Sequence, residues 1–92
     1  VEVSHEMDVK ILEKEIGRAL NILPEQCRKI FELSRFEELK YREISVLLNI
    51  SIKTVENQMG KALRIMREQL SAYLPLLLIT NSYGLLHLIL MP

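Results

Sequence analysis

Residues 41–63 read YREISVLLNISIKTVENQMGKAL, and they carry the strongest signal for the fold of the chain. Its apolar residues recur at three- and four-residue spacing on both sides of a short break at Asn49, which indicates two helices joined by a turn. Asparagine tolerates a left-handed backbone conformation, and Ser51 is a good N-cap for the following helix. The first helix is predicted over residues 41–48. Its inward-facing residues are predicted to be Ile44, Leu47 and Leu48.

The second helix of this stretch is predicted to run from Ser51 to about Tyr73 without a break, because the apolar spacing continues past residue 63. Its buried side is predicted to comprise Ile52, Val55, Met59, Ala62, Leu63, Met66 and Leu70. Its exposed side is predicted to comprise Lys53, Thr54, Glu56, Asn57, Gln58, Gly60 and Lys61.

Two further helices are expected before this stretch. Asp8 is a suitable cap for an amphipathic helix over about residues 8–21. The apolar residues that define it are Ile11, Leu12, Ile16, Ala19, Leu20 and Leu23. Pro24 suits the first turn of a second helix that ends near Phe36, and residues 37–40 form a polar connector. Cys27, Ile30, Phe31, Leu33 and Ser34 define that helix. Residues 1–7 are expected to be a linker.

The pattern predicts an all-α domain of four helices over residues 8–73, built around a helix-turn-helix. No segment alternates at period two, so no sheet is expected. The winged-helix-like DNA-binding superfamily, without a wing, is the corresponding fold class. In such a motif the first helix braces the second, whose N-terminal end enters the DNA major groove. Asparagine and glutamine suit adenine there, glutamate suits the cytosine amino group, and lysine suits guanine.

Charge distribution favours nucleic acid only mildly. The net charge is zero, but residues 26–70 carry nine basic and six acidic side chains, whereas residues 1–25 carry three basic and six acidic ones. The single cysteine, Cys27, excludes an internal disulfide and is predicted to be a buried core thiol. No residues stand at catalytic or metal-ligand spacing, so neither an enzyme, a metal site nor a cofactor is expected. The chain begins with Val1 and carries no secretory signal, so we expect a cytoplasmic fragment of a longer protein.

Three segments together resemble a known family. They read LPEQCRKIF at residues 23–31, YREISVLLNISIKTVENQ at 41–58 and KAL at 61–63. This combination resembles the C-terminal region-four domain of bacterial sigma factors, most closely the extracytoplasmic-function group. The run from Ser51 to Gln58 is similar to the iron-citrate-type members common in Bacteroidetes.

The resemblance implies a role in transcription initiation. Such a domain reads the −35 promoter element as part of RNA polymerase and binds the flap of the polymerase β subunit with another surface. By position, the residues implied to bind DNA are Lys40, Arg42, Ser51, Lys53, Thr54, Glu56, Asn57, Gln58 and Lys61. Lys40 and Arg42 fall where the bracing helix would contact phosphate. Three positions depart from the family pattern, which often has a basic residue at Glu56, an aromatic residue or histidine at Gly60, and a glycine at Glu38.

The final segment, residues 74–92, differs in character from the rest. Residues 71–92 carry no charge, and 14 of the 22 are apolar. Pro75, Asn81 and Gly84 interrupt the run, which argues against a membrane span. We expect a tail, helical in part, that folds back on the helices or binds an anti-sigma factor, another sigma domain or a second copy.

Two other functions fit the same pattern. A LuxR-type response-regulator domain shares the Ser-x-x-Thr-Val-Glu-Asn run at residues 51–57, but its recognition helix ends sooner and a dimerising helix follows. A helix-turn-helix used only for protein interaction would place the same helix against protein.

Overall fold

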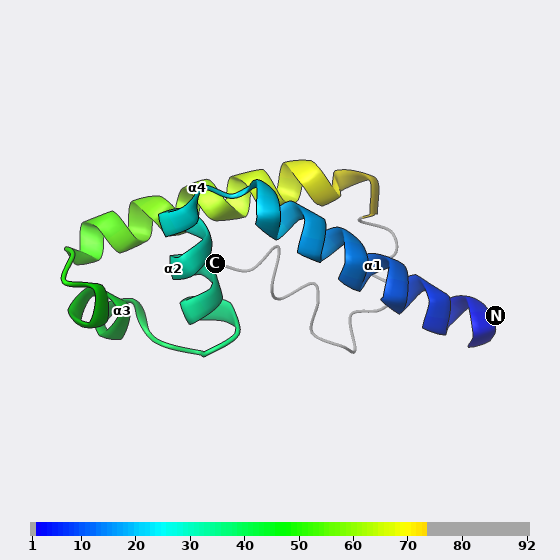
Figure 1. Cartoon of the computed structure of the whole chain (residues 1–92), viewed down its shortest axis with the longest axis horizontal. Helices are drawn as coiled ribbons and strands as arrows, with labels where there is room; N and C mark the ends of the chain where they lie inside the picture. The colour runs from blue at the N-terminus through cyan, green and yellow to red at the C-terminus, as the bar shows by residue number, and fades with distance from the viewer. Residues whose placement is uncertain (1, 74–92) are drawn as a thin grey trace.

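The computed structural model describes residues 2–73, and for residues 2–8 it describes the backbone only. Its α-helices are α1 (Glu2–Ile22), α2 (Glu25–Arg35), α3 (Tyr41–Leu48) and α4 (Ile52–Leu70), followed by the 3-10 turn η1 (Ser71–Tyr73). No strand occurs between residues 2 and 73, so the all-α prediction is confirmed. Helix α4 runs along one side of the molecule; α2 and α3 pack beneath its first half, and α1 runs beside its second half and beyond its end (Figure 1).

The hydrophobic core gathers on α4, because the other three helices all pack against it. One stripe of α4 supplies side chains to all three contacts at helical spacing, as the sequence pattern predicts. The buried apolar residues are Leu12, Ile16, Ala19, Leu23, Cys27, Ile30, Phe31, Ile44, Val55, Met59, Ala62, Leu63, Met66 and Leu70. Burial of this stripe is the main stabilising term, since it removes apolar surface from water.

Three residues predicted to be buried are exposed instead: Ile11 by 41%, Leu47 by 61% and Ile52 by 40%. The helices that carry Ile11 and Leu47 bury a narrower stripe than their apolar pattern suggests. Helix α1 contacts α4, so its buried positions follow the i, i+4, i+7 row that starts at Leu12. Ile52 is exposed for a different reason, because it is the first residue of α4 and directly follows the turn.

Helix α1 is longer than the sequence predicts. It begins at Glu2 rather than at Asp8, so the linker expected over residues 1–7 is helical from residue 2. The physical reason is that no glycine or proline stands before Gly17. Adding a residue to an existing helix also costs far less than nucleating one. Helix α1 therefore extends past the end of α4 (Figure 1).

The turn between α3 and α4 has the predicted chemistry. Asn49 adopts φ 56°, and the next amide, that of Ile50, donates to the Ser45 carbonyl at 3.0 Å, which closes the end of α3. Ser51 then caps α4, because its Oγ accepts a hydrogen bond from the Thr54 amide at 3.0 Å. These short-range bonds fix the direction in which α4 leaves the turn.

The connector between α2 and α3 contains a second left-handed residue, Glu38, at φ 58°. This conformation lets the chain reverse so that the Leu39 amide donates to the Leu33 carbonyl at 3.0 Å. A side chain with a Cβ is strained in this region, whereas glycine is not. Glycine would therefore suit this position, and Glu38 occupies it only at a cost.

Replacing Glu38 with glycine is expected to stabilise the domain by about 0.5–1 kcal/mol, because relief of the left-handed strain exceeds the added freedom of the unfolded chain. The measurement is urea unfolding followed by circular dichroism. Asn49→Gly is the matched control and should have a smaller effect, since asparagine already tolerates φ above zero. Equal effects at both positions would contradict the assignment of strain to Glu38.

The predicted apolar tail, residues 74–92, lies outside the described residues. None of the helices within residues 2–73 combines the length and the hydropathy that a membrane span requires.

Candidate nucleic-acid interface

Helix α4 presents one continuous polar row to solvent. Lys53, Asn57, Lys61 and Arg64 recur every three or four residues, so they share a face, and all four are exposed. The row starts in the first turn of α4 and extends away from the capped end. Such a row has the right spacing to place several side chains along one groove of DNA.

Arg64 also belongs to this row, although it is not among the residues that the resemblance implies to bind DNA. Its side chain is 61% exposed, and its guanidinium lies 3.9 Å from the Glu68 carboxylate one turn later. The signal that identifies it is its spacing, three residues after Lys61 and seven after Asn57. An exposed ion pair at this distance contributes little free energy, so the arginine can exchange the carboxylate for a phosphate.

Three predicted DNA-binding residues have side chains that bond to, or are half-buried in, the domain itself. The Ser51 hydroxyl caps α4 and lies 2.9 Å from the Thr54 hydroxyl, so these two side chains bond to each other. Gln58 is half-buried on another side of the helix from Asn57. The structure therefore separates Ser51, Thr54 and Gln58 from the exposed row, and their predicted roles in DNA binding remain predictions.

Glu56 is exposed and lies one residue before Asn57, beside the row rather than within the core contact. A carboxylate here repels phosphate, so it can approach DNA only where it meets a donor such as the cytosine amino group. Gly60 lies in the exposed row between Asn57 and Arg64, and a side chain added there would meet open space. The absent side chain leaves room for close approach of a large ligand to α4.

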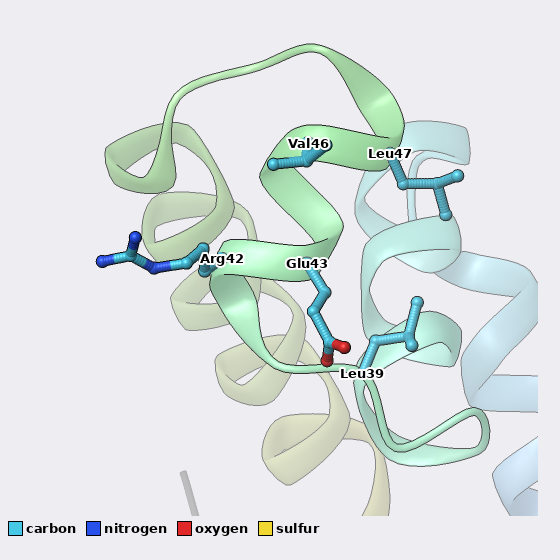
Figure 2. A pocket seen from close by; sticks show the side chains of 5 residues that line it. All are labelled: Leu39, Arg42, Glu43, Val46 and Leu47. Atoms are coloured by element: carbon cyan, nitrogen blue, oxygen red, sulfur yellow. The ribbon is translucent and has the colours of Figure 1, made fainter.

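Lys40 and Arg42 stand together at the start of α3. Lys40 is the N-cap residue, and its backbone amide donates to Glu43 Oε1 at 2.7 Å, which closes the first turn of the helix. Both side chains are exposed, and Figure 2 shows Arg42 extending away from α3. They therefore lie on the bracing helix of the motif, apart from the row on α4.

Cys27 locks α2 against the back of α4. Its side chain is fully buried, as predicted, and Sγ donates to the Gln58 carbonyl at 3.4 Å. Burial raises the pKa of the Cys27 thiol, while the nearby charges of Lys61 and Arg64 oppose that rise. The thiol consequently stays neutral, and the buried side chain packs α2 against α4.

The family comparison agrees with this geometry. A family model described as "Sigma-70, region 4" matches residues 13–66, which includes the second half of α1, all of α2 and α3, and most of α4. This chain belongs to the sigma-70 region 4 family. Neither curated proteins nor solved structures gave a match.

Membership in the region 4 family defines the general role. Region 4 is a DNA-binding, non-catalytic helix-turn-helix domain of sigma factors, and it acts in transcription initiation with promoter DNA and RNA polymerase. The family match does not favour a LuxR-type regulator or a module for protein interaction alone. Within residues 2–73 no group of three or more histidine, cysteine or acidic side chains is placed to hold a metal ion.

Proposed function

We propose that this region 4 domain reads the −35 element of promoters for a sigma factor of the extracytoplasmic-function group, of the iron-citrate type. The observation that carries the proposal is the exposed row of Lys53, Asn57 and Lys61, which starts at the capped N-terminus of α4. The turn chemistry orients this end outward, as entry into a major groove requires. The run from Ser51 to Gln58 supports the iron-citrate subtype by its resemblance.

Residues at different positions in the row would contact different parts of the DNA. Lys53 and Asn57 lie nearest the N-terminus and suit guanine and adenine edges, respectively. Lys61 and Arg64 lie further along and suit phosphate, where Lys40 and Arg42 would add contacts from α3. The first amides of α4 would also bind a phosphate, because the start of a helix has donors without intrahelical acceptors. Glu56 would face a cytosine amino group.

The partners follow from the same role. RNA polymerase would hold the domain through the flap of its β subunit, which compensates for the modest positive charge of residues 26–70. An anti-sigma factor would bind the domain when transcription is off. We place the protein in the cytoplasm, where polymerase meets DNA.

The test is run-off transcription by polymerase reconstituted with the sigma factor that carries this domain, on promoters in which each base pair of the −35 element is changed in turn. A change at a base pair that the domain reads should cost about 1–3 kcal/mol of binding free energy. Transcription from that promoter should therefore fall roughly five- to 150-fold. Transcription that is indifferent to every −35 change would overturn the proposal.

Lys61→Ala is expected to weaken promoter binding similarly for all sequences and to lower the salt dependence of binding. Loss of one phosphate contact reduces the slope of log K against log salt by about 0.9. The measurement is promoter binding by the reconstituted polymerase at several salt concentrations. Lys14→Ala is the control, because Lys14 is exposed on α1, away from the row. An unchanged slope for Lys61→Ala would remove this residue from the phosphate contacts.

A further inference from the structure

Helix α3 carries an apolar hollow on its outer surface. Its volume is about 500 Å³, and it is lined by Leu39, Arg42, Glu43, Val46 and Leu47, a set called here the α3 hollow. Val46 is 76% exposed and Leu47 is 61% exposed, the highest values among the large apolar residues whose side chains are described. Figure 2 shows Leu39 and Leu47 on the same side of α3, with the Glu43 side chain between Leu39 and the helix. Neighbouring apolar side chains this exposed mark a contact surface.

We propose that the α3 hollow is the docking site for residues 85–91 of the same chain. This segment reads LLHLILM and is uncharged. Removal of its apolar surface from water is favourable, as it is for the apolar surface of the hollow. Its one polar side chain, His87, matches the carboxylate that Glu43 contributes to the hollow. One contact would thus cover both an apolar surface and an apolar segment. The Arg42 side chain extends away from Leu39 and Leu47 (Figure 2), so its guanidinium would stay open to a phosphate.

The length of the chain after η1 favours residues 85–91 over residues 74–79, which read LPLLLI and are also apolar. Helix α3 lies at one end of α4 and η1 at the other (Figure 1), so the distance to cover is about the length of α4, roughly 28 Å at 1.5 Å per residue. Residues 74–79 span at most about 20 Å when extended, and therefore fall short. Residues 74–84 span up to about 40 Å, which brings residue 85 to the hollow.

The test measures disulfide formation within the full chain, in a Cys27→Ala background. The test pair is Val46→Cys with Leu88→Cys, and the control pair is Glu68→Cys with Leu88→Cys. Glu68 is exposed near the end of α4, closer along the chain to the tail. An undocked tail would therefore cross-link to position 68 at least as fast, because the shorter loop closes more readily.

Docking is expected to make the 46–88 disulfide form about tenfold faster than the 68–88 disulfide, within single chains at low protein concentration. Equal rates, a faster 68–88 pair, or a 46–88 disulfide that joins two chains would each overturn the proposal. A second measurement uses the chain with Cys27 intact. Leu88→Ser should shift the methyl resonances of Val46 and Leu47 and leave those of Leu12 in place. Unmoved Val46 and Leu47 resonances would overturn the proposal as well.

Discussion

Replacing Asn57 with alanine is expected to lower transcription from the cognate promoter about five- to 150-fold. Asn57 is exposed in the middle of the α4 row, where a carboxamide can donate to and accept from one adenine edge. Loss of such a two-bond contact costs about 1–3 kcal/mol of discrimination, and each 1.4 kcal/mol is a factor of ten. The loss should be greatest on the preferred sequence and smaller on promoters altered at the contacted base pair.

The measurement is run-off transcription with reconstituted polymerase, on the preferred promoter and on promoters changed at single −35 positions. Lys53→Ala should behave in the same way at a neighbouring base pair. Gln69→Ala is the matched control, because Gln69 is exposed on α4 but lies outside the row. Binding to polymerase should survive all three substitutions. A uniform loss on every promoter would show that Asn57 contacts the DNA backbone instead of a base.

The substitution with the largest expected effect on stability is Phe31→Ala, at about 3–5 kcal/mol of destabilisation. Phe31 is 0% exposed and lies in the core shared by α2 and α4. Its ring also meets that of Phe36 edge to face, with centroids 6.3 Å apart. Removal of the ring loses its transfer free energy and leaves a cavity in a small core. Because the total stability of a domain is about 5–15 kcal/mol, this loss is a large part of it.

Phe36→Ala is the control for Phe31→Ala. Phe36 is the same residue type and forms the other half of the ring pair, but it is 47% exposed. Its removal should cost about 1 kcal/mol, since less area returns to water and the surroundings can relax. Thermal and urea unfolding, followed by circular dichroism, measure both variants. Similar losses at the two positions would contradict the burial assigned to Phe31.

Local sequence signals predicted much of this fold, because their causes act over only a few residues. Asn49 and Ser51 specify the turn and the start of α4 through hydrogen bonds to neighbours three to five residues away. The limits of α3 were predicted correctly for that reason. The start of α1 was not, because no capping residue decides it and a helix without a breaker extends at low cost.

The candidate interface was predicted less completely than the fold. Lys53, Asn57 and Lys61 were found from spacing and residue type, and the structure places them in one exposed row. Arg64 was missed, although its spacing continues the row. The position of Gln58 depends on how α2 packs behind α4, where Cys27 contacts the Gln58 backbone. Spacing alone cannot show that contact.

The helix-turn-helix over residues 41–63 follows from the sequence, since its turn, cap and apolar spacing are local properties. The width of the stripe that each helix buries follows only from how the helices pack together. Leu47 has the spacing of a core residue, yet it is 61% exposed, because α3 touches the core along a narrow line. The width of such a contact depends on the angle at which distant helices cross, and residue spacing within one helix does not specify that angle.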